Sequence, residues 1–389
     1  MRKKIIIAIS SLILIGLYIL FFKAAIITEK SMNVCLHIND EDYNIRNDAI
    51  ALHKSLIVAD LHSDVLLWDR NINKQNNHGH TDIRRLQKGN FTLQVFDAVI
   101  KVPKGINYES NTGDTDIIST LAIANRWPIN TWSSLCERAL YQSKKLYEAA
   151  KKSNGELKVI TNSVALKNLL KDRKNNKKLL GGILSIEGLH ALEGKIENLQ
   201  RLFDAGYRMM GPVHFFDNQV GGSSAGVEQY GLTDFGKEVI IKMNQMNITV
   251  DIAHASPKLI DDILTLTTRP VVVSHTGIKG TYDSPRNLSD THMRQIAEGG
   301  GLIGIGFWDE AVGGPEVENI VKAMKYAIDL VSADHLALGS DWDGGTTTYF
   351  DAAHVSILTQ AMIDANINVV DIRKIMGENQ INFFLKNLP

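Results

Sequence analysis

The chain has little cysteine and lacks the common phosphate-binding motifs. Its only cysteines are Cys35 and Cys136, and no Cys-x-x-Cys pair is present, which excludes a cysteine-based metal site. No Gly-x-Gly-x-x-Gly opens a helix after the first predicted strand, and no Gly-Lys-Ser/Thr loop occurs. Nucleotide cofactors are therefore not indicated. The sequence leaves open whether the two cysteines pair.

The chain also lacks a marked excess of one charge. Its 42 basic and 43 acidic residues give a net charge of -1, and no basic block occurs beyond the extreme N-terminus. This balance argues against a nucleic-acid partner. A hydrophobic content of 44% is typical of globular proteins, and 389 residues suit one large α/β domain or two ordinary ones.

One long hydrophobic run stands at the N-terminus. Ile5 to Phe22 follow Arg2, Lys3 and Lys4 without a charge, which is just long enough to cross a bilayer as a helix. The positive-inside rule then places the rest of the chain on the extracytoplasmic side. We predict a signal anchor or transmembrane helix at 1–22, a linker and N-terminal segment at 23–50, and a catalytic domain at 51–389. A cleaved signal, giving an exported soluble form, remains the alternative.

Apolar runs alternate with helical patterns along the rest of the chain, which favours βα units and a parallel sheet. Eight runs qualify as strands, and eight such units suggest a (β/α)8 TIM-like barrel. An open doubly wound sheet is the alternative. The segment 101–180 predicts a helical insertion between strands 2 and 3, over the barrel mouth, and 351–388 predicts closing C-terminal helices. The predicted strands are Leu56–Asp64, Thr92–Ile100, Gly182–Glu187, Arg208–His214, Ile248–His254, Pro270–His275, Leu302–Phe307 and Leu336–Asp341.

Ionisable side chains close several of these runs, at the barrel end where functional groups gather. Alternation along one strand would put Asp60, His62 and Asp64 on the same face, so that His62 and Asp64 reach one cation and Asp60 lies a layer deeper. A His-x-Asp on an exposed loop is the alternative reading.

A second metal is predicted between His254 and His275, which end consecutive strands. A single histidine at such a place is more often a hydrogen-bonded core residue. Glu187 could bridge two cations, or simply begin a helix. Asp341 ends the last strand, where it could transfer a proton between a metal-bound water and a leaving group.

Several local motifs resemble those of the membrane (renal) dipeptidase family, peptidase family M19, in the amidohydrolase superfamily. They appear in the family's order from about Leu56 to the C-terminus: Asp60-Leu-His-Ser-Asp64, Ser185-Ile-Glu-Gly-Leu-His190, Gly231-Leu-Thr-Asp-Phe-Gly236, Val250-Asp-Ile-Ala-His254, Ser274-His275, Arg286-Asn287 and Gly339-Ser-Asp-Trp-Asp-Gly344. The segment 211–218 and Leu189 depart from the family's pattern.

The resemblance implies two zinc ions, one on His62 and Asp64 and one on His254 and His275, with Glu187 as the bridge. It also implies that His214 and Arg286, with the adjacent Asn287, bind substrate. Catalysis would then involve Asp341, His214 and Glu187.

The predicted activity is hydrolysis of small dipeptides with a free carboxylate, including those with a C-terminal D-residue, by a hydroxide that bridges the metals. Another metallohydrolase, such as an amidase or a lactonase, is the first alternative, and an anchored non-catalytic binding protein is the second. The sequence leaves open whether the chain forms a homodimer.

Overall fold

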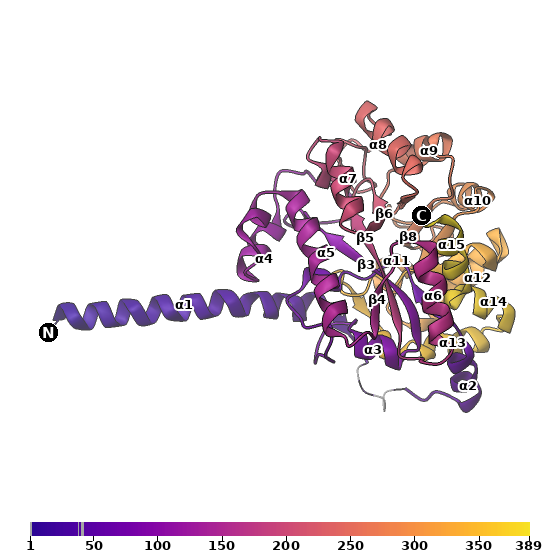
Figure 1. Ribbon diagram of the computed structural model, residues 1–389, viewed down its shortest axis with the longest axis horizontal. Coiled ribbons are helices and arrows are strands. Elements are labelled where there is room, and N and C mark those ends of the chain that lie inside the picture. Colours follow the sequence, from indigo (N-terminus) through magenta and orange to yellow (C-terminus); the bar gives the residue numbers. More distant parts are fainter. Residues whose placement is uncertain (1, 38, 40–42) are drawn as a thin grey trace.

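Eight parallel strands form a closed ring in the computed structural model, which describes residues 2–37, 39 and 43–389 (Figure 1). Neighbours follow the order β7, β6, β5, β3, β2, β10, β9, β8, and a parallel bridge from Asp251 to Val272 joins the two ends of this order. The predicted (β/α)8 barrel is thus confirmed. The strands are β2 Val58–Asp60, β3 Phe91–Val99, β5 Leu180–Glu187, β6 Tyr207–Gly211, β7 Thr249–Val250, β8 Val272–Thr276, β9 Leu302–Ile305 and β10 Leu336–Leu338.

Several strands are shorter than predicted. At their ends, carboxylate side chains accept hydrogen bonds from backbone N–H groups, and the backbone pairing between strands stops there. β2 stops at Asp60, whose carboxylate accepts from the backbone N–H of His62 and of Ser340. Asp251, just after β7, accepts in the same way from the N–H groups of Ala253 and Ser274. His62 and Asp64 therefore lie on a loop, and the predicted alternation of Asp60, His62 and Asp64 along one strand is wrong.

Helices surround the ring on the outside, and polar side chains cap most of their N-termini. Ser256, for example, accepts from the N–H of Leu259, and Pro257 occupies the first turn of α9. The helices after the second strand of the ring are α4 Ile117–Ala124, α5 Leu135–Lys152, α6 Ser163–Arg173, α7 Glu197–Asp204, α8 Asp234–Gln245, α9 Pro257–Leu266, α10 Asp290–Glu298, α11 Asp309–Val312 and α12 Val317–Val331.

The predicted insertion between strands 2 and 3 is present, but only part of it lies at the barrel mouth. The helix α4 borders the cavity described below, whereas α5 packs against the side of the barrel along β3 and β4 (Leu157–Val159), a short extra strand beside β5. The predicted C-terminal helices are also confirmed as α13 Ser356–Asp364, α14 Val369–Arg373 and α15 Asn379–Asn387.

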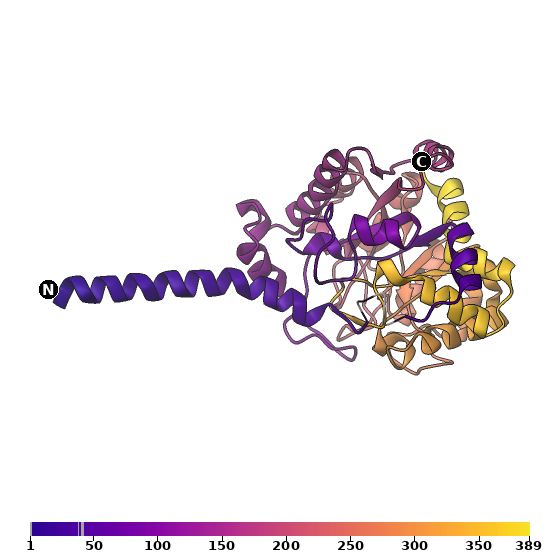
Figure 2. The same cartoon turned by 90° about the horizontal axis from the view of Figure 1, so that it is seen from below.

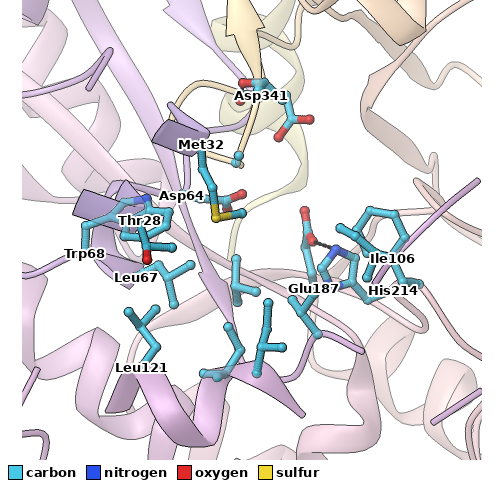
Figure 3. Close-up of a pocket in the computed structure, with 18 of the residues that line it drawn as sticks. Thr28, Met32, Asp64, Leu67, Trp68, Ile106, Leu121, Glu187, His214 and Asp341 are labelled. Carbon is cyan, nitrogen blue, oxygen red and sulfur yellow. Dashed lines mark hydrogen bonds and ion pairs between the residues drawn. The ribbon is translucent and has the colours of Figure 1, made fainter. Parts of the chain in front are cut away.

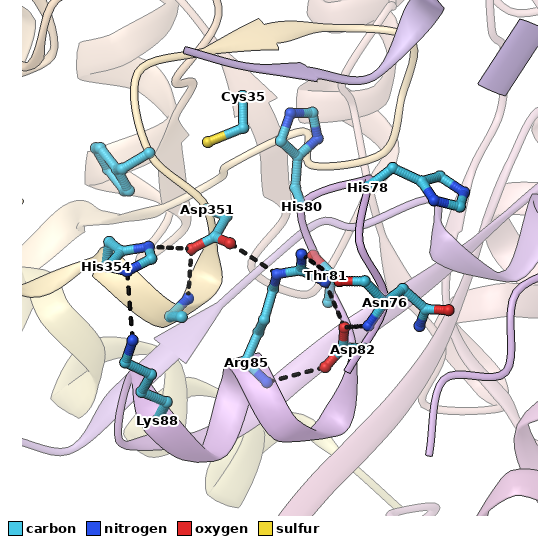
Figure 4. Close-up of polar contacts among 12 residues, drawn as sticks. Cys35, Asn76, His78, His80, Thr81, Asp82, Arg85, Lys88, Asp351 and His354 are labelled. Atoms are coloured by element: carbon cyan, nitrogen blue, oxygen red, sulfur yellow. Dashed lines mark hydrogen bonds and ion pairs between the residues drawn. The ribbon is translucent and has the colours of Figure 1, made fainter. Parts of the chain in front are cut away.

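A buried ion network fixes the chain that precedes β3 to the chain that follows β10 (Figure 4). Arg85, on α3 (Ile83–Lys88), pairs with Asp82 at 2.5 Å and with Asp351 at 2.7 Å. Asp351 also lies 2.6 Å from Nδ1 of His354. Because these groups are shielded from water, their loss would cost more than that of a surface pair. No disulfide joins Cys35 to Cys136, which is buried.

The N-terminal helix α1 (Arg2–Met32) extends away from the barrel in both views (Figures 1 and 2). Lys3–Met32 is long and apolar enough to cross a membrane, with a mean hydropathy of 2.8 over its best window and none of that window buried. The helix continues ten residues past the predicted boundary at Phe22. Its last turns are buried at Ala25 and Glu29.

The chain after α1 contacts the barrel at two places. Strand β1 (Val34–Cys35) pairs with β11 (Thr347–Thr348), which follows β10, and α2 (Asn47–Ser55) packs on α13. Met1 and residues 38 and 40–42 of the predicted anchor and linker lie outside the described residues. The division at residues 22 and 50 stays a prediction.

Candidate active site

The side chains predicted to bind metal converge at the C-terminal mouth of the barrel. His62 and Asp64 follow β2, Glu187 ends β5, His254 follows β7 and His275 lies in β8. All five are buried, with no more than 5% of any residue exposed. The closed ring therefore brings together groups that are far apart in the sequence.

Glu187 lies at the centre of this cluster. One carboxylate oxygen is 2.8 Å from Nε2 of His62, and the other is 2.6 Å from Nε2 of His214, as Figure 3 shows for His214. The same two oxygens lie 3.8 Å from Nε2 of His275 and of His254, respectively. The two oxygens of Glu187 therefore face different imidazoles, and each oxygen belongs to a group of side chains that could hold a cation.

The two histidines after β7 and in β8 face each other, with 2.9 Å between their Nε2 atoms. Ser274 Oγ lies 2.9 Å from Nδ1 of His275, which leaves Nε2 directed to the cluster. A hydrogen bond at one ring nitrogen commonly fixes a metal-binding imidazole in this way.

Several buried polar atoms of the cluster have no hydrogen-bond partner among the described residues. They are Nδ1 of His62, Nδ1 of His214, Nδ1 of His254 and both carboxylate oxygens of Asp97. Burying such atoms unpaired is costly, and carboxylates are the most costly of them. Their nitrogen and oxygen ligand types suit zinc or a similar first-row cation. The residues present thus fit a metal centre.

The histidines of the cluster differ in the direction of their pKa shifts. Burial lowers the pKa of His62, but the carboxylates of Asp64 and Glu187 outweigh burial and raise that pKa well above its usual value. Burial alone would raise the pKa of Glu187, yet His214 and His62 hold it well below its ordinary range. Positive charge is therefore strongly favoured between His62 and the two carboxylates.

The opposite shift applies at the other end of the cluster. Burial, helped by the nearby Arg286, lowers the pKa of His254 well below its usual value, and burial, followed by His62 and Arg286, does the same to His275. Both rings are therefore neutral at pH 7. Neutral imidazole is the form that binds a metal.

Asp341 lies at the edge of the cluster, near His62, Asp64 and Glu187. Its Oδ1 is 3.8 Å from Nε2 of His62, and burial together with Asp64 and Glu187 raises its pKa well above the ordinary value. The backbone at Asp341 has a positive φ of 58°, and a side chain at Gly344 would lie 2.2 Å from Oδ1. A left-handed backbone at a non-glycine residue is a strained arrangement of the kind found at functional sites.

Two of the three predicted substrate-binding residues border the cavity. His214 and Arg286 line it, and Arg286 donates from Nη2 to the carbonyl of His275 while its Nε has no partner among the described residues. Asn287 does not line the cavity, because its amide donates to the carbonyls of Tyr282 and Ala311. Its position holds the loop that carries Arg286.

Sequence reasoning missed Asp97, a fully buried residue of β3. Ligand atoms of His62, Asp64, Asp97 and Glu187 all lie within 4.8 Å of one another. An aspartate inside the apolar run Phe91–Ile100 was the available signal. Trp308 and Tyr108, joined by a 3.1 Å hydrogen bond at the cavity wall, were missed as well.

Asp60 was predicted to lie deeper than the ligands, and it does. Its carboxylate accepts from Gln94 at 2.6 Å and lies 2.8 Å from the Ser340 hydroxyl, whose oxygen is also 2.8 Å from the carbonyl oxygen of His62. Asp60 thereby connects the loop of His62 to the loop of Asp341. His190 is buried against Phe216 and Asn218.

The cluster forms one end of a cavity of about 630 Å³. A buried centre rich in imidazole and carboxylate, at the C-terminal end of a barrel, defines a candidate metal-dependent hydrolase. The model of the membrane dipeptidase family (peptidase family M19) matches residues 46–386, so the chain belongs to this family. The predicted family and enzyme class, metal-dependent dipeptidases, are confirmed.

Curated relatives agree with this membership. A protein encoded in the pqqA 5′ region of Klebsiella pneumoniae is 31% identical over 45% of this chain and 69% of its own length. Dipeptidase aclJ of Aspergillus oryzae is 26% identical over 51% of this chain and 50% of its own, and an uncharacterised Schizosaccharomyces pombe dipeptidase is 24% identical over 68% and 61%. The chain thus spans only half to two thirds of the fungal relatives.

Solved structures share the fold. A dipeptidase of family M19 has a TM-score of 0.71 at 23% identity, covering 86% of this chain and 98% of its own. A metallopeptidase from Rhodobacter sphaeroides, bound to a phosphinate mimic of L-Ala-D-Ala, has a TM-score of 0.70 at 23% identity and covers 86% and 99%. The probable dipeptidase PvdM of Pseudomonas aeruginosa has 0.73 at 16%, covering 88% and 98%.

Proposed function

We propose that this chain hydrolyses dipeptides at a centre of two zinc ions. The observation that carries the proposal is the position of Glu187, with His62 on one carboxylate oxygen and His214 on the other, and with His254 and His275 3.8 Å away. His62 and Asp64 would hold one ion, His254 and His275 the other, and Glu187 would lie between them. Bound zinc would supply Lewis acidity and lower the pKa of a water to ~7.

The chain's own residues would position the substrate. Arg286 would bind the terminal carboxylate through its unpartnered Nε and an Nη group, since a guanidinium matches a carboxylate with two parallel bonds. His214, whose ring lines the cavity, would donate to the carbonyl oxygen of the scissile bond as negative charge develops there.

Asp341 would carry the proton. Its raised pKa suits a group that takes a proton from the attacking water and gives it to the leaving amine. Neither step requires a serine or cysteine nucleophile.

Metal content and dipeptide turnover together test this proposal. The full chain in lipid nanodiscs should contain about two zinc ions by mass spectrometry and cleave L-Ala-L-Ala. L-Ala-D-Ala belongs in the panel because a mimic of it binds the Rhodobacter sphaeroides structure. Chelation should abolish turnover and zinc should restore it. Two ions without dipeptide turnover would favour an amidase or lactonase, and a chain that binds no metal would contradict the proposal.

We further propose that α1 is retained and holds the catalytic domain at the extracytoplasmic face of a membrane. The burial of Ala25 and Glu29 against the barrel supports retention. Membrane fractionation, with protease accessibility in intact cells and the mass of the mature N-terminus, tests both parts. The homodimer stays a prediction, which size measurement of the nanodisc particle would test.

A further inference from the structure

The last turns of α1 form a wall of the catalytic cavity. Phe21, Ala24, Ala25, Thr28 and Met32 all line it, which is one stripe of the helix at spacings of one, three and four residues. Figure 3 shows Thr28 and Met32 directed to the same space as Asp64, Glu187 and Asp341. The opposite face of the helix is exposed, as at Ile27 with 59%.

This wall is fixed to the barrel by buried polar contacts. Glu29 lies 2.5 Å from Nε of Arg70, and Nη2 of the same arginine lies 2.6 Å from Asp343, two residues after Asp341. Asn33 accepts from the N–H of Gly345 on the same loop at 2.9 Å. The end of α1 is therefore held by the loop that carries the proposed proton carrier, not tethered loosely beside it.

The cavity has two chemically different halves. One holds the ionisable cluster with Arg286, Trp308 and Tyr108. The other is lined mostly by apolar side chains from α1, from α4, from the end of β3 and from the segments after β2 and β3, including Leu67, Trp68, Val99, Val102, Ile118 and Leu121. A volume of about 630 Å³ is that of a pocket for a ligand of drug size, well beyond the needs of two alanines.

The order of strands gives the direction in which a substrate would lie. β3 and β8 are four strands apart in either direction around the ring, so the loops after them face each other across the mouth. A substrate with its carboxylate on Arg286, after β8, and its amide at the cluster extends its amino-terminal residue toward β3. That is the side of Val99, Val102 and α4.

We propose that the preferred substrates are amphipathic, with a long apolar chain on the amino-terminal residue that lies between α1 and α4. This deepens the proposed function and rests on it for the placement of the carboxylate and the amide. The apolar side chain of the substrate would displace water from the apolar half of the cavity, and this removal of apolar surface from water favours binding. The same helix that anchors the protein would thus select its substrate.

A series of X-alanine dipeptides tests the proposal, with X as alanine or as 2-amino acids with six, eight and ten carbons. The full chain is used in zinc-loaded form in nanodiscs. We expect kcat/KM to rise with length, by up to about fourfold per methylene until the cavity is full. Ala25→Trp should lower the ratio of kcat/KM for the ten-carbon substrate to kcat/KM for dialanine at least tenfold. Ile27→Trp, a substitution on the exposed face of the same helix, should leave that ratio unchanged.

A second readout does not depend on turnover. A ten-carbon probe with a ketomethylene unit in place of the scissile amide and a diazirine at the end of its chain should label peptides 21–32 and 117–124, and Ala25→Trp should reduce this label. Labelling without cleavage of any dipeptide would uphold the apolar site and defeat the proposed reaction. If dialanine is cleaved but kcat/KM does not rise with the length of X, and the probe labels other peptides, the inference is overturned while the proposed dipeptidase activity stands.

Discussion

Nε2 of His254 lies 2.9 Å from Nε2 of His275, although the two residues belong to different βα units of the barrel. Both rings are buried, and the pKa of each is lowered well below its usual value, first by burial. Two neutral imidazoles whose Nε2 atoms lie this close have at most one proton between them, so at least one Nε2 directs its lone pair toward the other ring. A cation between the two rings would satisfy both.

Replacing one of these rings should therefore remove one metal ion and leave the other. We expect His275→Ala to contain about one zinc per chain instead of two, and to lose more than about a hundredfold in kcat/KM for dialanine. Metal analysis after gel filtration measures this. His292→Ala, at an exposed pair with Asp261, is the matched control and should retain both ions. Two ions in His275→Ala would remove this residue from the ligand set.

Asp341 should affect the rate without changing metal content. Asp341→Asn keeps the size of the side chain but cannot carry the proton, so kcat should fall by about 10²–10⁴ while two ions remain bound. Steady-state kinetics with parallel metal analysis check this. Asp334→Asn, at the surface pair with Lys374, should behave as the unmodified chain. A loss of metal in Asp341→Asn would show that Asp341 is a ligand.

Arg286 should lower KM by binding the carboxylate of the substrate. Arg286→Met should raise KM for dialanine by about ten- to a hundredfold, since a charge-assisted hydrogen bond contributes about 1.5–3 kcal/mol. Dialanine amide, which lacks the carboxylate, should be turned over equally by both enzymes. Arg294→Met on α10 provides the surface control. Equal losses for dialanine and its amide would assign Arg286 a structural role.

The fold and the convergence of the candidate ligands could be predicted because both depend on repeated local signals. Each strand is a short apolar run, and the ionisable residue at the end of such a run lies at the C-terminal mouth of the barrel. The strand lengths could not be predicted, since the carboxylates of Asp60 and Asp251 end β2 and β7 by accepting from backbone N–H groups of other segments. Such contacts are properties of the closed ring.

Asp97 and the packing of α1 against the barrel were missed for related reasons. The sequence around a single aspartate in a strand does not indicate whether its side chain joins a group of candidate metal ligands or contacts one hydrogen-bond partner. For Asp97 this is decided by the packing of β3 between β2 and β5. A terminal apolar helix reads as a membrane segment from its composition. The burial of Glu29 against Arg70 depends on tertiary structure, because these residues are 41 positions apart.

His53 should make stability depend on pH. Burial lowers its pKa to about 4, and its ring contacts Thr359 and the carbonyl of Gly89. Between about pH 6.5, the usual pKa, and pH 4, the unfolded chain binds more protons than the folded one, so acidification through this window destabilises the fold. This group should account for about 2 kcal/mol between pH 7 and pH 5. Denaturant unfolding of His53→Gln should show a pH dependence smaller by that amount, and an unchanged dependence would mean that His53 titrates normally.

Arg70 should be the residue that holds α1 in place. It is the shared partner of two buried carboxylates, Glu29 and Asp343. Arg70→Met would leave both without their cation, and breaking a buried pair from one side costs about 3–5 kcal/mol. Lys374→Met removes a surface pair instead and should cost less than about 1 kcal/mol. Thermal unfolding in nanodiscs compares the two variants. If Arg70→Met were no less stable than Lys374→Met, Glu29 would have to be solvated, and α1 could not be a fixed wall of the cavity.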